Sequence, residues 1–406
     1  MIEYLKVLVM SRLPAFMNHM VSRNVMFTKL LQSMAGIENM PDEINEIIKK
    51  NTDKVHYTDE EIDYKLLLKV VSDYKITLDS LVPINSGMVA IVFSGVNAEK
   101  QRVIVKIKRN NIRERIKDGY LQFSRIYNLI STIAYPFGYL DEILVNIKSF
   151  IDSRDYILTQ CNFDNEIEAI VMTKDTVDQY TKDILIPTIY NTEEDRTNTE
   201  FIIMDMIEGT TCYNVDEKYK EQACELIFRF TFITSYFSEI YHVDLHPGNI
   251  FCIPDGDKCK IGVIDFGMNV HANDEIRTFS HGCLNGLIEI DNGNTTNIDI
   301  LKHCAKTTIP PMDLEHMSLE QYKHLNDLFV QLVETVGDGK LDEKALHTAI
   351  DGIRKVVKSR TIVLSDDIIK YAMGLSMLQS SARLLVGDRK KLSNIIKKAL
   401  REVMSY

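Results

Sequence analysis

Two short apolar runs joined by a turn constrain this fold most, because polar side chains stand at both ends of the pair. Residues 242–267 read HVDLHPGNIFCIPDGDKCKIGVIDFG. The runs IFCI and IGVI predict two strands, and the letters PDG between them predict a turn. A tight hairpin would bring Asp244, Asn249 and Asp265 close together near the strand ends. We therefore expect a β-hairpin that carries a cluster of polar side chains.

The oxygen atoms of these three side chains match the preferences of one metal ion. Two carboxylates and an amide carbonyl are hard ligands, which suit Mg²⁺ held jointly with substrate phosphates. Protein kinases use the same order: an Asp base, an Asn five residues later and an Asp-Phe-Gly sequence. Here these are Asp244, Asn249 and Asp265. An ordinary acidic hairpin is the alternative, and the joint occurrence of both motifs disfavours it.

Composition and charge limit the class of protein. The 406 residues are 45% hydrophobic and 26% charged, which suits a globular protein of two or three packed units. The net charge of −11 argues against a general nucleic-acid binder. The seven cysteines are scattered without a C-x-x-C pair, so we expect neither a zinc site nor a disulfide framework. A protein without disulfides suits a reducing compartment, which we therefore expect.

No apolar run in the sequence approaches the roughly 18 residues that span a bilayer. The N-terminus also lacks the small-residue cleavage site of a signal peptide. We therefore expect a soluble, intracellular (cytoplasmic) protein without a transmembrane segment. The sequence leaves open peripheral contact with a membrane, the oligomeric state and the organelle or host compartment.

The order of helix-like and strand-like patterns along the chain predicts three parts. Residues 1–75 read as helical, residues 76–207 begin with strands and continue through a helical insertion, and residues 208–406 read as largely helical around the hairpin. Within the third part we expect a long helix at about 216–241. After Gly267 we expect helices to the end of the chain.

The strand-like sequence at 81–108 contains the features of a nucleotide site. Its turn includes Ser86 and Gly87, which are small enough to let backbone N–H groups approach phosphate oxygens. Lys106 follows two strands later, on the face opposite Val103 and Val105, where a kinase keeps its phosphate-pairing lysine. A lysine in such a sheet is more often a solvated edge residue, but the order of turn, lysine and metal ligands favours a binding role.

Two further positions complete this interpretation. The stretch 200–209 reads EFIIMDMIEG, a strand closing on a polar turn, and in a two-lobed kinase the backbone of Asp205 and Met206 would meet adenine. The alternative is a plain edge strand. A kinase also needs a helix-borne glutamate to hold its lysine, and the helical insertion offers Glu166 and Glu168.

These motifs resemble those of the UbiB/ADCK-type (ABC1-like) atypical protein kinases over most of the chain. The family's H-x-D-x-[HN]-P-G-N loop is HVDLHPGN at 242–249, and its D-F-G is at 265–267. Its nucleotide loop, P-I-A-S-A-S-I-A-Q-V, resembles PINSGMVAIV at 83–92. Its K-x-G-Q segment resembles KLLQ at 29–32, and its E-x-D pair falls on the amides of QCN at 160–162.

The resemblance implies an α+β, two-lobed protein-kinase-like fold with an N-terminal helical extension and a large helical C-lobe. It implies ATP and Mg²⁺ as cofactors, and phosphotransferase or ATPase activity on a protein, lipid or small-molecule acceptor that the sequence does not identify. Lys106, held by Glu166, would pair with phosphates, Asn249 and Asp265 would coordinate Mg²⁺, and Asp244 would orient or deprotonate the acceptor.

The resemblance also implies that Lys29 and Gln32 line the pocket from the N-terminal extension. Two other functions stay open. A nucleotide-binding pseudokinase scaffold is kept open by the altered accessory motifs. A small-molecule kinase of the choline or aminoglycoside type has a similar loop, but its second metal Asp usually lies in a D-[FW]-[DE] context, unlike Asp265.

Overall fold

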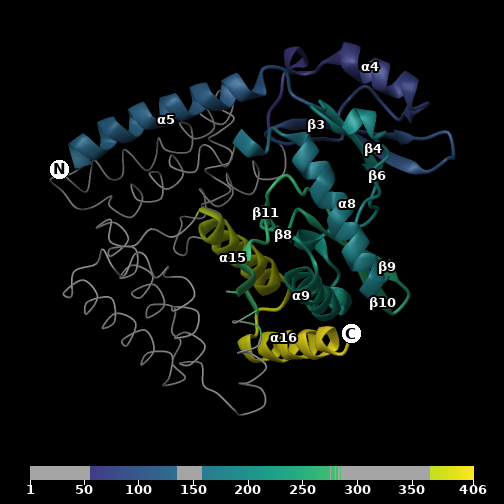
Figure 1. Ribbon diagram of the computed structural model, residues 1–406, viewed down its shortest axis with the longest axis vertical. Coiled ribbons are helices and arrows are strands. Elements are labelled where there is room, and N and C mark those ends of the chain that lie inside the picture. The colour runs from purple at the N-terminus through teal and green to yellow at the C-terminus, as the bar shows by residue number, and fades with distance from the viewer. Residues whose placement is uncertain (1–54, 135–157, 275, 279, 282–283, 285–365) are drawn as a thin grey trace. The chain divides into compact units, whose positions relative to one another are not determined.

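The computed structural model of the protein describes residues 55–134, 158–274, 276–278, 280–281, 284 and 366–406 (Figure 1). These residues form two compact units. Unit 1 consists of 55–134, 158–171, Pro187–Glu208 and Asp265–Met268. Unit 2 consists of Met172–Ile186, Gly209–Ile264 and the described residues from Asn269 onward.

The described part of unit 1 is built around a five-stranded antiparallel sheet. Its strand order is β1-β3-β4-β6, and β2 also pairs with β3. The strands are β1 (Thr77–Leu78), β2 (Asn85–Ser86), β3 (Ala90–Val96), β4 (Arg102–Lys108) and β6 (Phe201–Asp205). The predicted strands between 81 and 108 are therefore confirmed, and β4 lies between β3 and β6.

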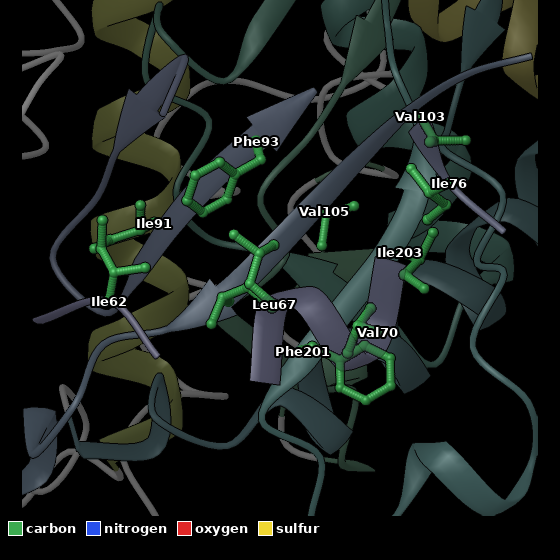
Figure 2. Close-up of a cluster of buried hydrophobic side chains, with 11 residues drawn as sticks. Ile62, Leu67, Val70, Ile76, Ile91, Phe93, Val103, Val105, Phe201 and Ile203 are labelled. Carbon is green, nitrogen blue, oxygen red and sulfur yellow. The ribbon is translucent and has the colours of Figure 1, made fainter. Parts of the chain in front are cut away.

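One face of this sheet is covered by helix α4 (Tyr64–Asp73). Figure 2 shows Leu67 of α4 beside Val105 of β4, and Val70 of α4 beside Phe201 of β6, in one buried cluster. Side chains alternate along a strand, so Lys106 points to the opposite face from Val105, as predicted. Each large apolar side chain buried in this cluster contributes about 1.5–3 kcal/mol. The cluster thus fixes β4 and the direction in which Lys106 leaves it.

Two longer helices lie next to strands of this sheet in the sequence. Helix α5 (Ile112–Ala134) follows β4, and helix α8 (Phe163–Tyr180) precedes β6. The first half of α8 belongs to unit 1, up to residue 171. Short 3₁₀ turns lie at Asp59–Glu61 and Glu194–Arg196.

The predicted hairpin is confirmed in unit 2. Strands β9 (Ile250–Asp255) and β10 (Lys258–Val263) pair antiparallel, with Val263 opposite Ile250. Gly256 sits in the connection with φ +65°, which glycine adopts at little cost. Strand β5 (Ile184–Leu185) extends this sheet beside β10, and strand β7 (Thr210–Thr211) extends it beside β9.

The helices of unit 2 pack on one another around α9 (Lys220–Phe237). Helices α15 (Asp366–Leu385) and α16 (Arg389–Met404) both contact α9. The α9–α16 contact carries ion pairs between Lys391 and Glu221 at 2.9 Å and between Lys398 and Glu225 at 2.7 Å. Short 3₁₀ turns at Cys212–Asn214 and Glu217–Tyr219 precede α9.

Two predictions about unit 2 are wrong. The helix expected to reach residue 241 ends at Phe237, and Ile240–His242 form strand β8 instead. The segment after Gly267, expected to be helical, begins with strand β11 (Asn269–His271), which pairs with β8. A run of Phe, Ile and Tyr suits a buried helix and a buried strand equally, so the hydrophobic periodicity could not show where helix α9 ends and strand β8 begins.

The α+β class of the fold is confirmed, with the larger sheet in unit 1 and the packed helices in unit 2. The predicted N-terminal extension lies outside the described residues, except for residues 55–75. The three-part domain division therefore stays a prediction. Among the helices that the structure describes, none combines the length and the apolar character that crossing a bilayer requires.

Candidate functional site

Lys106, Glu166 and Asp265 lie together in unit 1. The Lys106 Nζ atom is 2.6 Å from Glu166 Oε1 and 3.2 Å from Asp265 Oδ1. Only 1% of the Glu166 side chain is exposed, against 12% for Lys106 and 48% for Asp265. The lysine is thus held by one buried carboxylate and one that faces solvent.

The charges of this group shift its pKa values. Burial alone would lower the pKa of Lys106, but the carboxylates of Asp265 and Glu166 raise it, so the ammonium form persists. Burial raises the pKa of Glu166, and the nearby Asp265 charge adds to the rise against the opposing effect of Lys106. The site therefore keeps a permanent cation beside a carboxylate that is costly to ionise.

The first turn of α8 is anchored so that Glu166 faces β4. The carboxylate of Asp164 accepts hydrogen bonds from the backbone N–H groups of Asn198 at 2.7 Å and Thr199 at 2.9 Å. The side-chain oxygen of Asn162 accepts a 3.2 Å bond from the Asp164 N–H, as at a helix N-terminus. These bonds tie the start of α8 to the loop before β6.

Asp265 has a backbone conformation that few residues adopt. Its φ is +60°, in the left-handed region where Asp and Asn are enriched among non-glycine residues. A Cβ on Gly267 would lie 3.4 Å from Asp265 Oδ1 and 3.6 Å from Glu166 Oε2. A glycine there keeps the space beside both carboxylates open.

Asp244 and Asn249 lie in unit 2, in one hydrogen-bonded loop. His242 Nδ1 accepts a 3.1 Å bond from the Asp244 N–H, and its Nε2 lies 3.2 Å from the carbonyl of Ile264. Asn249 Nδ2 donates to the Asp244 carbonyl at 2.9 Å, and the Ile264 N–H donates to the Asn249 carbonyl at 3.0 Å. His242 and Asn249 therefore fix the backbone on both sides of Asp244.

Helix α15 also supports this loop, which the sequence did not predict. A Cβ on Gly374 would lie 2.8 Å from the Cα of Val243. The buried Ser381 hydroxyl donates a 2.6 Å bond to the carbonyl of Leu245. The two neighbours of Asp244 are thus each held by α15. The one sequence feature that could have predicted this contact is the spacing of Gly374 and Ser381, which are seven residues apart and so lie on one face of a helix.

Ser86 and Gly87 lie where β2 turns into β3. The Ser86 N–H donates to Asn85 Oδ1 at 2.7 Å, and the Ser86 hydroxyl donates to the Val55 carbonyl at 2.6 Å. The Gly87 N–H donates to the Ala90 carbonyl at 2.9 Å. Both predicted N–H donors are therefore already bonded within unit 1.

Asp205 and Met206 lie at the end of β6. The Asp205 N–H donates to the Thr188 carbonyl at 3.0 Å, and the Met206 N–H donates to the Arg102 carbonyl at 3.1 Å. The Asp205 carboxylate accepts a 2.6 Å bond from the Tyr190 hydroxyl. Burial and this bond raise the pKa of Tyr190 to about 12, so the hydroxyl stays a donor. An adenine contact at these two residues would have to use groups other than their N–H.

Asp265 in unit 1 and Asn249 in unit 2 each offer an oxygen atom of the kind that Mg²⁺ takes when it also binds phosphates. Within the described ranges, no three His, Cys, Asp or Glu side chains form a group that could hold a metal ion by themselves. Asp265 presents a half-exposed carboxylate, and Asn249 donates through Nδ2, which leaves its amide oxygen as a ligand atom. Mg²⁺ usually takes one or two protein oxygens and completes its shell with phosphate oxygens and water.

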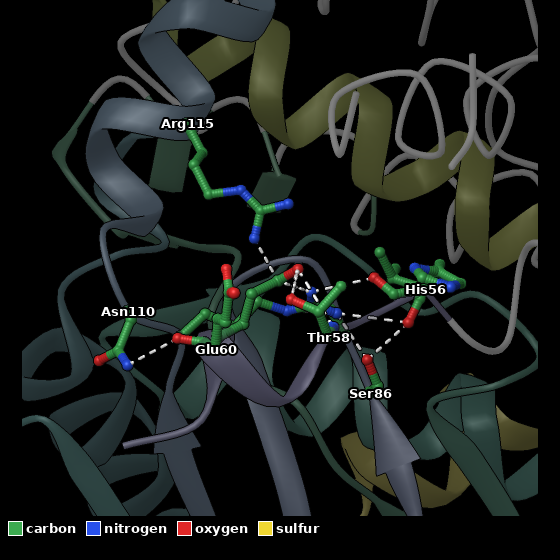
Figure 3. A network of polar contacts seen from close by, with 10 residues as sticks. His56, Thr58, Glu60, Ser86, Asn110 and Arg115 are labelled. Atoms are coloured by element: carbon green, nitrogen blue, oxygen red, sulfur yellow. Dashed lines mark hydrogen bonds and ion pairs between the residues drawn. The ribbon is translucent and has the colours of Figure 1, made fainter. Parts of the chain in front are cut away.

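The remaining predicted positions are Lys29, Gln32 and the amides at residues 160–162. Lys29 and Gln32 lie outside the described residues. Of the amides at 160–162, Asn162 caps α8 as described above, and the buried Gln160 Nε2 has no hydrogen-bond partner in the described part of the chain. No sequence pattern predicted the role of Arg109, a fully buried residue whose Nη2 donates a hydrogen bond to Ser86 Oγ, within the network of polar contacts that Figure 3 shows.

A model of the ABC1 atypical kinase-like domain matches residues 77–298, which is more than half of the chain. An uncharacterized protein of Synechocystis sp. is 22% identical over 241 residues, covering 56% of this chain and 54% of that protein. An uncharacterized protein in the hydrogenase 1 5′ region of Clostridium pasteurianum is 26% identical over 221 residues, covering 51% and 39%. The chain thus spans about half or less of the length of these curated relatives.

Two solved structures are also similar. The Rv3197–erythromycin complex from Mycobacterium tuberculosis is matched with a TM-score of 0.45 and 15% identity, over 97% of this chain and 95% of that chain. The Rio2 kinase from Chaetomium thermophilum is matched with a TM-score of 0.29 and 12% identity, over 65% and 77%. The match to the family model and the helices and strands of the two units, and not these two solved structures, are the evidence for the kinase-like fold.

Proposed function

Because this chain belongs to the ABC1 atypical kinase-like family, we propose that it is an ATP- and Mg²⁺-dependent phosphotransferase or ATPase. The observation that carries the proposal is the buried ion pair between Lys106 and Glu166, 2.6 Å apart, with the Asp265 carboxylate 3.2 Å from the same ammonium. A kinase requires this lysine–glutamate pair and a metal-binding aspartate.

The proposed roles follow from the chemistry of each group. Lys106 pairs with nucleotide phosphates, and Glu166 holds its ammonium in place. Asn249 and Asp265 supply oxygen ligands to Mg²⁺, which when bound neutralises charge on the phosphate oxygens. Asp244, held by His242 and Asn249 on either side, orients or deprotonates the acceptor hydroxyl or a water molecule. Catalysis by such a site is mainly positioning and charge neutralisation.

The acceptor class is not fixed by these residues. A protein, a lipid, a small molecule or water would each present an oxygen to Asp244. The family match favours this proposal over a small-molecule kinase of the choline or aminoglycoside type. A nucleotide-binding scaffold without turnover remains the second candidate, because amides stand at Gln160 and Asn162 where the resembling family carries carboxylates.

The test uses the full chain. Thermal-shift titration with ATP, with and without Mg²⁺, measures binding, and phosphate release measures turnover. We expect Mg²⁺-dependent stabilisation by ATP and slow phosphate release, both lost in Asp265→Ala. Asp175→Ala, an exposed position on α8, is the matched control and should behave as the wild type.

Three outcomes separate the candidates. Binding with turnover that Asp265→Ala abolishes supports the proposed enzyme. Binding without turnover, under every acceptor tried, favours the scaffold. Turnover that is unchanged in Asp265→Ala overturns the metal assignment.

A further inference from the structure

Phe163, the first residue of α8, places its ring against two ammonium groups of β4. The Nζ atom of Lys106 is 5.6 Å from the centroid of the ring, and the Nζ atom of Lys108 is 5.0 Å from it. The two lysines are two residues apart on one strand, so their side chains leave β4 on the same face. Phe163 therefore lies on the lysine face of the sheet in unit 1.

The distances and the burial both suit an attraction between cation and ring. A cation within about 6 Å of an aromatic centroid is attracted by the negative face of the ring, and more strongly where water is excluded. Phe163 is 0% exposed, and the Lys106 side chain is 12% exposed. The ring thus attracts the Lys106 ammonium without carrying a charge of its own.

The hydrogen bonds of Lys106 show what such a neighbour adds. An ammonium has three N–H donors. Lys106 bonds to Glu166 and Asp265, and no other described residue offers it an acceptor. A ring face attracts the charge as a whole and has no lone pair that accepts an N–H. Phe163 therefore holds the ammonium while one N–H stays available for a phosphate oxygen.

The ring itself is fixed by the loop before β6. Asp164, the next residue along α8, accepts two backbone N–H bonds from this loop, as described above. Lys108 donates to the carbonyl of Thr199 at 3.1 Å and to Glu200 Oε1 at 2.7 Å. The same loop thus anchors the start of α8 and the second lysine that faces the ring. Phe163 is held at a defined distance from β4.

The alternative is that Phe163 is an ordinary core residue. The apolar cluster in Figure 2 includes Val103 and Val105 of β4, which point to the face opposite Lys106, and Phe163 is not one of its members. An aliphatic side chain could fill the place of Phe163 equally well, but only an aromatic face attracts a cation. The two interpretations therefore differ in what happens when the ring keeps its shape and loses its charge distribution.

We propose that Phe163 is a positioning residue of the candidate site, whose ring holds the Lys106 ammonium where it pairs with a nucleotide phosphate. This inference rests on the proposed function. Because Phe163 is fully buried, it acts through Lys106 and not on the nucleotide.

The experiment replaces Phe163, in the full chain, by phenylalanines that carry one, two and three ring fluorines. Each fluorine withdraws electron density from the ring face and changes the shape little. We expect ATP affinity to fall stepwise, by about threefold to tenfold over the series, the range of a buried cation–π contact. Adenosine has no phosphate for Lys106, so its affinity should stay within about twofold.

Phe93 provides the matched control. It is also 0% exposed, and among the described residues no lysine or arginine lies over its ring. The same fluorinated series at Phe93 should leave ATP affinity unchanged. Phe163→Leu removes the ring altogether and should weaken ATP binding at least as much as the trifluorinated residue does.

A second measurement needs neither ATP nor a variant. The ring current of Phe163 should shift the Cε proton resonances of Lys106 and Lys108 upfield in the NMR spectrum of the wild-type chain. Resonances of Lys106 at the position of a solvated lysine would show that the ring does not face this ammonium, and would overturn the inference even if every variant failed to fold.

The remaining outcomes are distinct. ATP affinity that stays flat along the Phe163 series, or ATP and adenosine affinities that fall together, overturns the positioning role and leaves the proposed function standing. A wild-type chain that binds no ATP, with or without Mg²⁺, overturns the proposed function and this inference with it. A stepwise and selective loss of ATP affinity, together with the upfield Lys106 resonances, supports the inference.

Discussion

Ser381 on α15 donates a 2.6 Å hydrogen bond to the carbonyl of Leu245, the residue that follows Asp244. Both residues are buried, so the bond is shielded from water. Ser381→Ala leaves this buried carbonyl without its donor, and we expect a loss of about 1–3 kcal/mol in the free energy of unfolding. Urea unfolding measures it, with the exposed Ser393→Ala on α16 as a control that should change nothing.

The same variant separates support of the fold from support of Asp244. If the bond positions the proposed base, Ser381→Ala should lower the rate of phosphate release while ATP affinity stays near that of the wild type. ATP titration and phosphate release on one preparation make this comparison. Equal turnover in Ser381→Ala and the wild type, in a variant shown to be folded, would limit Ser381 to a structural role.

Gly374 is the second point at which α15 meets this loop, and it has no room for a side chain. A Cβ would lie 2.8 Å from the Cα and 2.9 Å from the Cβ of Val243, so backbone would have to move. We expect Gly374→Ala to cost about 1–3 kcal/mol, although alanine normally favours a helix over glycine. Gly387→Ala meets nothing within 4 Å and is the matched control. Thermal unfolding that ranks both variants alike would contradict the close approach.

Local patterns in the sequence predicted the parts of the fold that local chemistry decides. The hairpin of β9 and β10 follows from two apolar runs and a glycine that can take a positive φ. The direction of Lys106 follows from strand alternation. The end of α9 could not be predicted in this way, because pairing with Asn269–His271, not propensity, makes Ile240–His242 a strand.

The residues that hold the candidate site in place could not be predicted from the sequence, for a related reason. Ser381 and Leu245 are 136 residues apart in the chain, and nothing local to either one signals the bond. Arg109 lies in a basic stretch after β4 that suggests a solvated helix start, yet its acceptors come from residues 55–61 and 86–87. Sequence motifs identify residues that could act chemically, whereas tertiary contacts decide which residues hold them.

Glu166 should make nucleotide binding sensitive to mild acid. Burial raises its pKa above the ordinary value of 4.5, so it takes up a proton at a higher pH than a free glutamate does. The folded state binds this proton more tightly than the unfolded state, so protonation does not itself unfold the chain. It does remove the ion pair with Lys106. We expect ATP affinity to fall as the pH is lowered, with a midpoint above 4.5, before thermal stability is lost.

The control for this prediction is Glu166→Gln, which cannot titrate. Its ATP affinity should be lower than that of the wild type at neutral pH by roughly tenfold or more, the value of a charged hydrogen bond, and flat across the acid range. Because both proteins meet the same protonation states of ATP, the difference between their curves isolates Glu166. A wild-type midpoint at or below 4.5 would contradict the shift.

Glu61 should govern acid stability in the opposite direction. Its pKa is lowered in the folded chain by Arg115 and Arg109 against the effect of burial, so it contributes stability above its unfolded pKa near 4.5. That contribution is lost as the pH falls through the lowered folded value. Glu61→Gln leaves the buried Arg109 charge uncompensated, and we expect a loss of about 3–5 kcal/mol at neutral pH.

The pH dependence of this loss tests its electrostatic origin. As the pH falls from 4.5 through the lowered folded pKa of Glu61, the wild-type carboxylate becomes neutral like the glutamine, so the two free energies of unfolding should converge. Urea unfolding of both proteins at a series of pH values measures the gap. If the gap stays constant into the acid range, packing rather than charge accounts for the effect of Glu61, and Arg109 must be stabilised in the fold mainly by the carbonyl groups around it.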